Sequence, residues 1–277
     1  MVNPDIFFYE RDGYNCPALF GGAMKVVVFL ITLFWIHGVC GEIMKIEQIG
    51  DIEKIALDPG AWIFFDIDYT LIQPDHPALG NIKDRRFREV YAQCSLEQKR
   101  LLPIFMVSQV PSVLVSPEIP TTIERLKEKK HTVVGCTAAD TSSLSHIGSV
   151  PQWRSRDLRR LGIVFTNKGE STQFKQFVSY RSSYPSFEDG LLYTNVTTSK
   201  GEVVLAFFDY LQERPSQVVL VDDVLDNLRS MELAMERERI PFLGLHFSRK
   251  KEEGEVSDEK WYEVWDSIYQ RVREETE

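Results

Sequence analysis

The chain has 277 residues, of which 43% are hydrophobic and 26% are charged. This composition excludes a disordered protein and is sufficient to bury a substantial core, as one large domain or as a domain with an inserted lobe. Acidic residues outnumber basic ones, which gives a formal net charge of −9, and no run of Lys and Arg is longer than the three at residues 249–251. We therefore expect no nucleic-acid partner, because binding to a phosphate backbone needs a basic surface.

Residues 24–41 have the order of a secretory signal peptide, with one lysine, an apolar run and then small residues. The apolar run is shorter than the roughly 18 residues that a membrane span usually needs. We expect an exported bacterial protein, periplasmic or secreted, cleaved after Cys40 or Gly41 and with no membrane span in the mature chain 42–277. Residues 1–23 are interpreted as an extension upstream of the true start. A buried N-terminal element and a retained anchor are the open alternatives.

Two cysteines belong to the mature chain. Cys94 and Cys136 are far apart in the sequence, and neither belongs to a C-x-x-C pair or a Cys/His cluster, so a zinc site is not expected. Two buried free thiols are the favoured interpretation. A disulfide between the two in an oxidising compartment is the alternative.

Short apolar runs alternate with amphipathic stretches along the mature chain. This alternation predicts an α/β fold with a Rossmann-like parallel sheet, because parallel strands need helical crossovers between them. The predicted strands are residues 62–65, 132–136, 162–165, 218–221 and 242–245.

One interval is too long for a simple crossover. Residues 73–130 have a helical pattern and predict a helical insertion followed by a return helix. Residues 258–274 carry Trp, Val, Ile and Tyr at helical spacing. They predict a terminal amphipathic helix whose aromatic stripe packs in a core. The prolines expected to break the helical pattern of the insertion are Pro103, Pro111, Pro117 and Pro120.

Two acids follow the first predicted strand. Asp66 and Asp68 come directly after the apolar run WIFF, so a buried strand delivers them to its carboxyl end. Two carboxylates at one place are unfavourable unless a cation or a proton offsets them. An EF-hand calcium loop does not fit, because Leu71 and Pro77 stand where such a loop needs Gly and Glu.

Polar side chains end two further strands. Thr137 follows the run VVGC, and Asp222 and Asp223 follow the run VVLV. The carboxyl ends of parallel strands meet in one crevice, so we expect these side chains beside Asp66 and Asp68. A hydroxyl after a strand is by itself more typical of a helix cap, whereas acids that close a buried strand indicate a site.

A lysine precedes the last of these strands by one predicted helix. Ser199 and Glu202 form a capping-box pattern, which places Lys200 in the first helical turn, near the crevice. Lys168 lies in a similar string and is the rival, but a polar stretch follows it rather than a core helix. We favour Lys200 as the cation of the site.

The pieces DxDxT, T, K and DDxxDN, in this order on a strand–helix alternation, resemble the haloacid dehalogenase (HAD) superfamily of phosphohydrolases. The resemblance covers nearly all of residues 61–247, and strings such as VVGCTAAD and SKGEVVLAFF are similar to a branch of exported bacterial HAD-like proteins of undefined function. It implies that the insertion at about 73–130 is a helical cap that sets specificity. Many relatives have Thr-Ala-Arg in the second motif, whereas Ala139 stands in place of the arginine here.

The resemblance implies a role for each residue of the motifs. Asp66 would attack phosphorus, and Asp68 would serve as general acid and then as general base. Thr137 and Lys200 would bind the phosphoryl oxygens. Mg²⁺ would be held by the Asp66 carboxylate, the Asp68 main-chain carbonyl, and Asp222 or Asp223.

We therefore predict a Mg²⁺-dependent phosphomonoesterase that acts on a small phosphorylated substrate through an aspartyl-phosphate. A catalytically faded HAD-like protein that binds a partner in the envelope or in a host is the alternative. Asp68 argues against that alternative, because a binding protein has no need of the acid and base. Phosphoryl transfer to an acceptor other than water uses the same residues and stays open.

Overall fold

The computed structural model describes residues 41–80, 85–248 and 256–277. Apart from Gly41, the predicted leader and the extension upstream of it lie outside these ranges. In the ranges that are described, no helix combines the length and the apolar character needed to cross a membrane.

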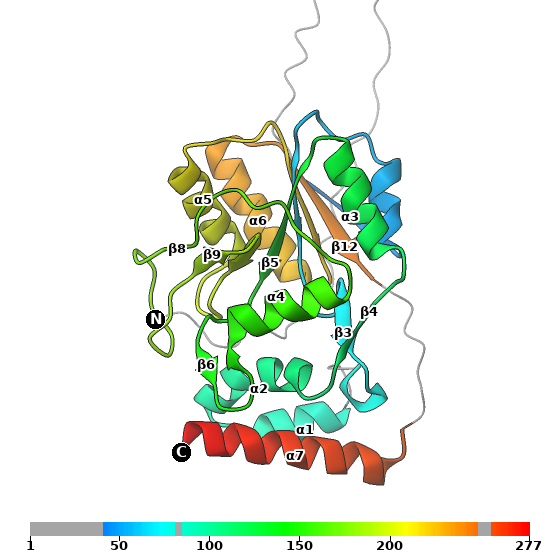
Figure 1. Cartoon of the computed structure of the whole chain (residues 1–277), viewed down its shortest axis with the longest axis vertical. Coiled ribbons are helices and arrows are strands. Elements are labelled where there is room, and N and C mark those ends of the chain that lie inside the picture. Colours follow the sequence, from blue (N-terminus) through cyan, green and yellow to red (C-terminus); the bar gives the residue numbers. More distant parts are fainter. Residues whose placement is uncertain (1–40, 81–84, 249–255) are drawn as a thin grey trace, which may run out of the picture. The chain divides into compact units, whose positions relative to one another are not determined.

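A central sheet of eight strands lies within the described residues (Figure 1). Six neighbouring strands are parallel, and two antiparallel strands extend one edge. The α/β fold with a mostly parallel, Rossmann-like sheet is thus confirmed. In spatial order the strands are β1 (Glu42–Ile46), β12 (Phe242–Phe247), β11 (Val218–Asp222), β2 (Trp62–Phe65), β5 (Thr132–Thr137), β10 (Leu191–Tyr193), β9 (Ser186–Glu188) and β8 (Thr172–Gln173).

Helices cover both faces of this sheet, and Figure 1 shows α3 and α5 on opposite sides of the strands. In β2, Ile63 and Phe65 pack toward one face while Trp62 and Phe64 pack toward the other, and all four are buried. A strand between two layers is expected to be apolar on both sides. The first face is covered by η2 (Ile49–Lys54), α3 (Ile119–Glu128) and the end of α4 (Val150–Arg160), and the second by α5 (Lys200–Leu211) and α6 (Leu225–Glu238).

Four of the five predicted strands are present with small shifts at their ends, and the fifth is wrong. Residues 162–165 form no strand, although Ile163 and Phe165 are buried. Their side chains pack on one face of the sheet, while β10 forms the ladder beside β5. An apolar run of four residues does not distinguish these two placements. The strands β1 and β10 were not predicted.

The insertion after β2 is helical, as predicted. It leaves and rejoins the main body through the antiparallel pair β3 (Ile72–Pro74) and β4 (Ser112–Leu114). Between these strands lie the short η3 (Pro77–Leu79) and the helices α1 (Arg85–Gln93) and α2 (Leu96–Ser108). We call α1 and α2 the lobe.

Two features of the α2 sequence concern the start of the helix and its interior. Ser95 is its N-cap and forms a capping box with Gln98. Pro103 lies inside α2, so its prediction as a helix break is wrong. Neighbours such as Leu101, Leu102 and Phe105 are buried, and this burial offsets the hydrogen bond that a proline removes from a helix.

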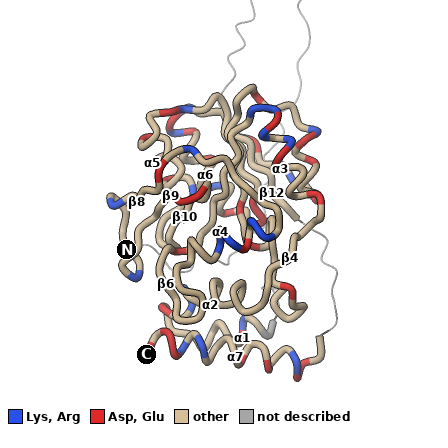
Figure 2. The backbone as a smooth tube through the Cα atoms, viewed as in Figure 1, with Lys and Arg blue, Asp and Glu red and all other residues tan. Residues whose placement is uncertain are grey.

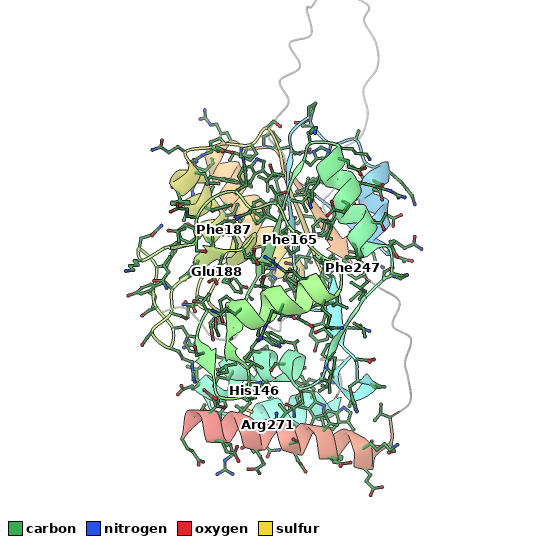
Figure 3. All side chains as sticks on the ribbon, in the orientation of Figure 1. His146, Phe165, Phe187, Glu188, Phe247 and Arg271 are labelled. Atoms are coloured by element: carbon green, nitrogen blue, oxygen red, sulfur yellow. The ribbon has the colours of Figure 1, made fainter. Side chains whose placement is uncertain are left out.

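The C-terminal helix α7 (Asp258–Thr276) packs on the lobe, with Trp261 and Trp265 buried in the same apolar cluster as α2. The predicted stripe is therefore core packing. His146, from the hairpin of β6 (Ser143–Leu144) and β7 (Gly148–Ser149), lies 4.5 Å from the Phe105 ring of α2, and Figure 3 shows it on the lobe near Arg271. Charges of both signs are interspersed along the length of α7 (Figure 2).

Within the described part of the chain, Cys94 and Cys136 are buried and form no disulfide. Cys94 belongs to the apolar cluster of the lobe, whereas Cys136 belongs to a cluster of the main body. The expectation of free thiols is confirmed, and the alternative of a disulfide is wrong.

Candidate active site

Three residues that were predicted to form a site meet at the carboxyl edge of the sheet. Asp66 follows β2, Asp222 is the last residue of the neighbouring β11, and Lys200 opens α5. The Lys200 Nζ lies 2.5 Å from Asp66 Oδ1 and 2.7 Å from Asp222 Oδ2, and all three side chains are buried. One ammonium group therefore bridges two carboxylates. The rival Lys168 pairs instead with Glu213, at 2.7 Å.

Local structure around α5 holds Lys200 in place. The Ser199 hydroxyl accepts a hydrogen bond from the Glu202 N–H at 3.4 Å and caps the helix. The predicted capping box is only half formed, because the Glu202 carboxylate pairs with Arg237 of α6, at 2.9 Å. A Cβ on Gly201 would come within 2.4 Å of a backbone oxygen of α6. The first turn of α5 thus packs directly on the α6 backbone, as only glycine permits at this distance.

A tight turn after β2 orients Asp66. Its main-chain N–H donates to the Val221 carbonyl of β11 at 2.9 Å, and Tyr69 adopts a positive φ of 64°, which is uncommon for residues other than glycine. The buried Thr70 donates its hydroxyl to Asp66 Oδ2 at 3.1 Å. Sequence reasoning assigned no role to Thr70, although it is the last letter of the DxDxT pattern.

The Asp222 carboxylate accepts four hydrogen bonds. Its Oδ1 accepts from the Val224 N–H at 2.8 Å, each of its oxygens accepts from Asn227 Nδ2 at 3.1 Å, and Oδ2 also accepts from Lys200. These bonds occupy the acceptor capacity of a carboxylate. Ligand oxygens of Asp66, Asp222 and Asp223 all lie within 4.8 Å of one another. Such a group of hard oxygen donors fits Mg²⁺.

Burial and ion pairing set the protonation states in this cluster. Burial raises the pKa of Asp222 to about 6, although the charge of Lys200 acts in the opposite direction. Burial by itself lowers the pKa of Lys200, but the carboxylates of Asp222 and Asp66 outweigh this effect and raise the pKa above its usual value. Lys200 therefore stays cationic and neutralises part of the acidic charge.

Asp68 has a counter-charge that sequence reasoning missed. Arg154 of α4 donates from Nη2 to Asp68 Oδ1 at 2.7 Å and to Oδ2 at 2.9 Å. Burial raises the pKa of Asp68, and the charge of Arg154 opposes this shift. A signal was present in the sequence, because Val150, Arg154 and Leu158 recur every four residues on the buried face of α4. An arginine in an apolar stripe needs a partner.

Thr137 ends β5 and is buried. Its hydroxyl accepts a hydrogen bond from the Ala139 N–H at 3.2 Å, and within the described ranges it bonds to neither Asp66 nor Lys200. The site is nevertheless close to this strand end, because β5 pairs in parallel with β2, the strand that Asp66 follows. A contact between Thr137 and phosphate stays a prediction.

A surface recess of about 800 Å³ lies outside this cluster. It lies beside the outer face of α4 and the turn between β9 and β10, where its lining includes Arg156, Arg159 and Asp189. None of the clustered acids borders it. The recess is therefore not part of the candidate active site.

The fold and the site define an α/β protein whose parallel sheet carries an acidic, lysine-bridged cluster at its carboxyl edge. The chain belongs to the family described as Protein of unknown function (DUF2608), which matches residues 42–270. An uncharacterised protein of Rickettsia felis is 23% identical over 143 residues, which cover 50% of this chain and 48% of that protein. The chain thus spans about half the length of this curated relative. No solved structure is significantly similar to the chain.

Proposed function

We propose that the protein is a Mg²⁺-dependent phosphomonoester hydrolase of the HAD type that acts through an aspartyl-phosphate. The observation that carries the proposal is the Lys200 ammonium, which bridges Asp66 and Asp222 from adjacent strand ends beside Asp223. Phosphoryl transfer needs mainly positioning and charge neutralisation. A preorganised group of acids around one buried cation supports both.

The proposed reaction has two steps. In the first, a carboxylate oxygen of Asp66 attacks phosphorus, the bond to the ester oxygen breaks, and that oxygen takes a proton from Asp68. In the second, Asp68 accepts a proton from water, whose oxygen attacks phosphorus and releases phosphate and the Asp66 carboxylate. Lys200 and Thr137 bind phosphoryl oxygens in both steps.

Three side chains of the site would hold Mg²⁺, namely Asp66, Asp222 and Asp223, together with the main-chain carbonyl of Asp68. The ion would neutralise charge on the phosphoryl oxygens. Asp222 already accepts four hydrogen bonds, so direct ligation by Asp222 would replace one of the two 3.1 Å contacts from Asn227. The lobe, with α7 packed on it, is proposed as the cap that sets specificity for a small phosphorylated substrate.

The test is hydrolysis of p-nitrophenyl phosphate by the full chain, with Mg²⁺ and with EDTA. We expect turnover that needs Mg²⁺ and that falls at least about a thousandfold in Asp66→Asn, since the isosteric amide is not a nucleophile. The matched control is Asp266→Asn, because Asp266 is an exposed acid of α7, and it should keep full activity.

Full activity in Asp66→Asn would refute the mechanism. No turnover by the wild-type protein, with this ester and with a panel of small phosphomonoesters, would favour the faded binding protein instead. Capture of a partner from the envelope or from a host would then be the next experiment.

A further inference from the structure

We infer that Arg154 is a positioning residue that holds the Asp68 carboxylate in the orientation used in catalysis, an inference that rests on the proposed function. The two residues are 86 positions apart in the chain, and a single nitrogen, Nη2, donates to both Asp68 oxygens at 2.7 and 2.9 Å. A contact to both oxygens restricts rotation of the carboxylate about its last bond. Such restriction is the positioning that proton transfer requires.

The exposed fractions of the Asp68 and Arg154 side chains indicate different roles for the two residues. The Asp68 side chain is 25% exposed, whereas the Arg154 side chain is 0% exposed. Solvent, and with it a substrate, can therefore reach Asp68 but not Arg154. Arg154 acts through Asp68 and does not itself contact the reacting atoms.

Packing alone gives no reason for an arginine at this position. Its Nε and Nη1 atoms are buried and have no hydrogen-bond partner among the described residues, and unpartnered buried donors are unfavourable. An apolar side chain would continue the stripe of Val150 and Leu158 without that disadvantage. The ion pair with Asp68 is the contact that the arginine adds.

The helix that carries Arg154 is anchored on both sides of it. Val150 packs in the cluster of the lobe, and Leu158 packs in a cluster of the main body. The ring of Trp153 also lies 4.5 Å from the Arg154 Cζ, a distance at which an aromatic face attracts a cation. The helix is thus held at both ends and the guanidinium lies against an aromatic ring, which restricts the carboxylate that it binds.

The experiment compares two esters whose leaving groups differ in their need for a proton, p-nitrophenyl phosphate and glycerol 3-phosphate. The variants are Arg154→Met, Asp68→Asn and their double combination. Arg156→Met is the control, because Arg156 is an exposed arginine of the same helix. Values of kcat and KM are measured for each, with Mg²⁺ present and after circular dichroism has shown that each variant is folded.

We expect Arg154→Met to lower kcat for glycerol 3-phosphate about a hundredfold, with KM changed less than about threefold, because general acid catalysis contributes about 10²–10⁴. The loss in kcat/KM with p-nitrophenyl phosphate should be at least about tenfold smaller, since nitrophenolate leaves without a proton. The esters are compared by kcat/KM because this ratio covers only the steps up to release of the leaving group, whereas Asp68 serves both esters as base in the second step. The double variant should be no slower than Asp68→Asn, as residues that act as one unit are not additive. If Arg154→Met does not fold, Arg154→Gln, which is polar but has no charge, carries the same comparison.

Equal losses of kcat/KM with both esters, or losses that multiply in the double variant, would show that Arg154 has a structural role and would overturn the inference alone. A wild-type protein that hydrolyses neither ester would overturn the proposed function and this inference with it. The two failures are distinguishable, because the first requires an active wild-type protein.

Discussion

Removal of the Lys200 ammonium is the sharpest test of the site, because it requires no substrate. Lys200→Met keeps the length of the side chain and leaves Asp66 and Asp222, both buried, without the cation that lies 2.5 and 2.7 Å from them. Breaking a buried ion pair by removing one partner costs about 3–5 kcal/mol, since the other charge stays buried and uncompensated. We expect a loss of free energy of unfolding in this range at pH 7.5.

The assay is urea unfolding in EDTA, followed by tryptophan fluorescence. Trp62 is a buried reporter in the main body, and its ring lies 5.3 Å from the Phe208 ring on the helix that Lys200 opens. Lys54→Met is the control, as this exposed lysine pairs with Asp51 at 2.7 Å, and it should leave the free energy of unfolding nearly unchanged.

A double variant separates charge from packing. Asp222→Asn in the Lys200→Met background removes one of the two uncompensated carboxylates and should recover about 1–2 kcal/mol. If Lys200→Met is as stable as Lys54→Met, the bridge does not stabilise the protein. If Asp222→Asn makes the double variant less stable than Lys200→Met, the loss has a cause other than unpaired charge.

Two further predictions concern residues that pack on the lobe. Trp265→Ala should cost about 3–5 kcal/mol in urea unfolding, because Trp265 is fully buried and stacks on Trp261 at 5.1 Å, whereas Tyr262→Ala at an exposed position of α7 should cost little. Burial and the charge of Arg271 lower the pKa of His146, and Glu275 acts against them. The unfolded chain then takes up a proton that the folded chain does not, so stability should fall as pH falls below about 6.5, and less steeply in His146→Gln.

The parts of the fold that could be predicted from the sequence are those that a local pattern specifies. The strands β2, β5, β11 and β12 are apolar runs buried on both faces, and such runs stand out from their polar neighbours. The strand β10, with three residues, is shorter than the windows in which periodicity is visible. The edge strand β1 has exposed positions that weaken the same pattern.

The surface on which α7 packs could not be predicted from the sequence, for a different reason. The aromatic stripe predicts that this helix is buried on one face, but any apolar surface satisfies that requirement. The structure places Trp265 Nε1 3.1 Å from the Ala78 carbonyl, 187 residues away in the chain. Periodicity within one helix carries no information about a contact at that separation.

The candidate active site contains one ion pair that the motifs predict and one that they do not. The pattern DxD brings two acids to one strand end, and sequence reasoning assigned Lys200 as the cation of the site. The structure instead gives each acid its own cation: Lys200 of α5 pairs with Asp66, and Arg154 of α4 pairs with Asp68. Two separate pairs let the carboxylates differ in role, because the charge that acts most directly on each belongs to a different helix. Only Lys200 belongs to the set of motifs. The pairing of Arg154 with Asp68 could not be predicted, because it depends on where the fold places α4.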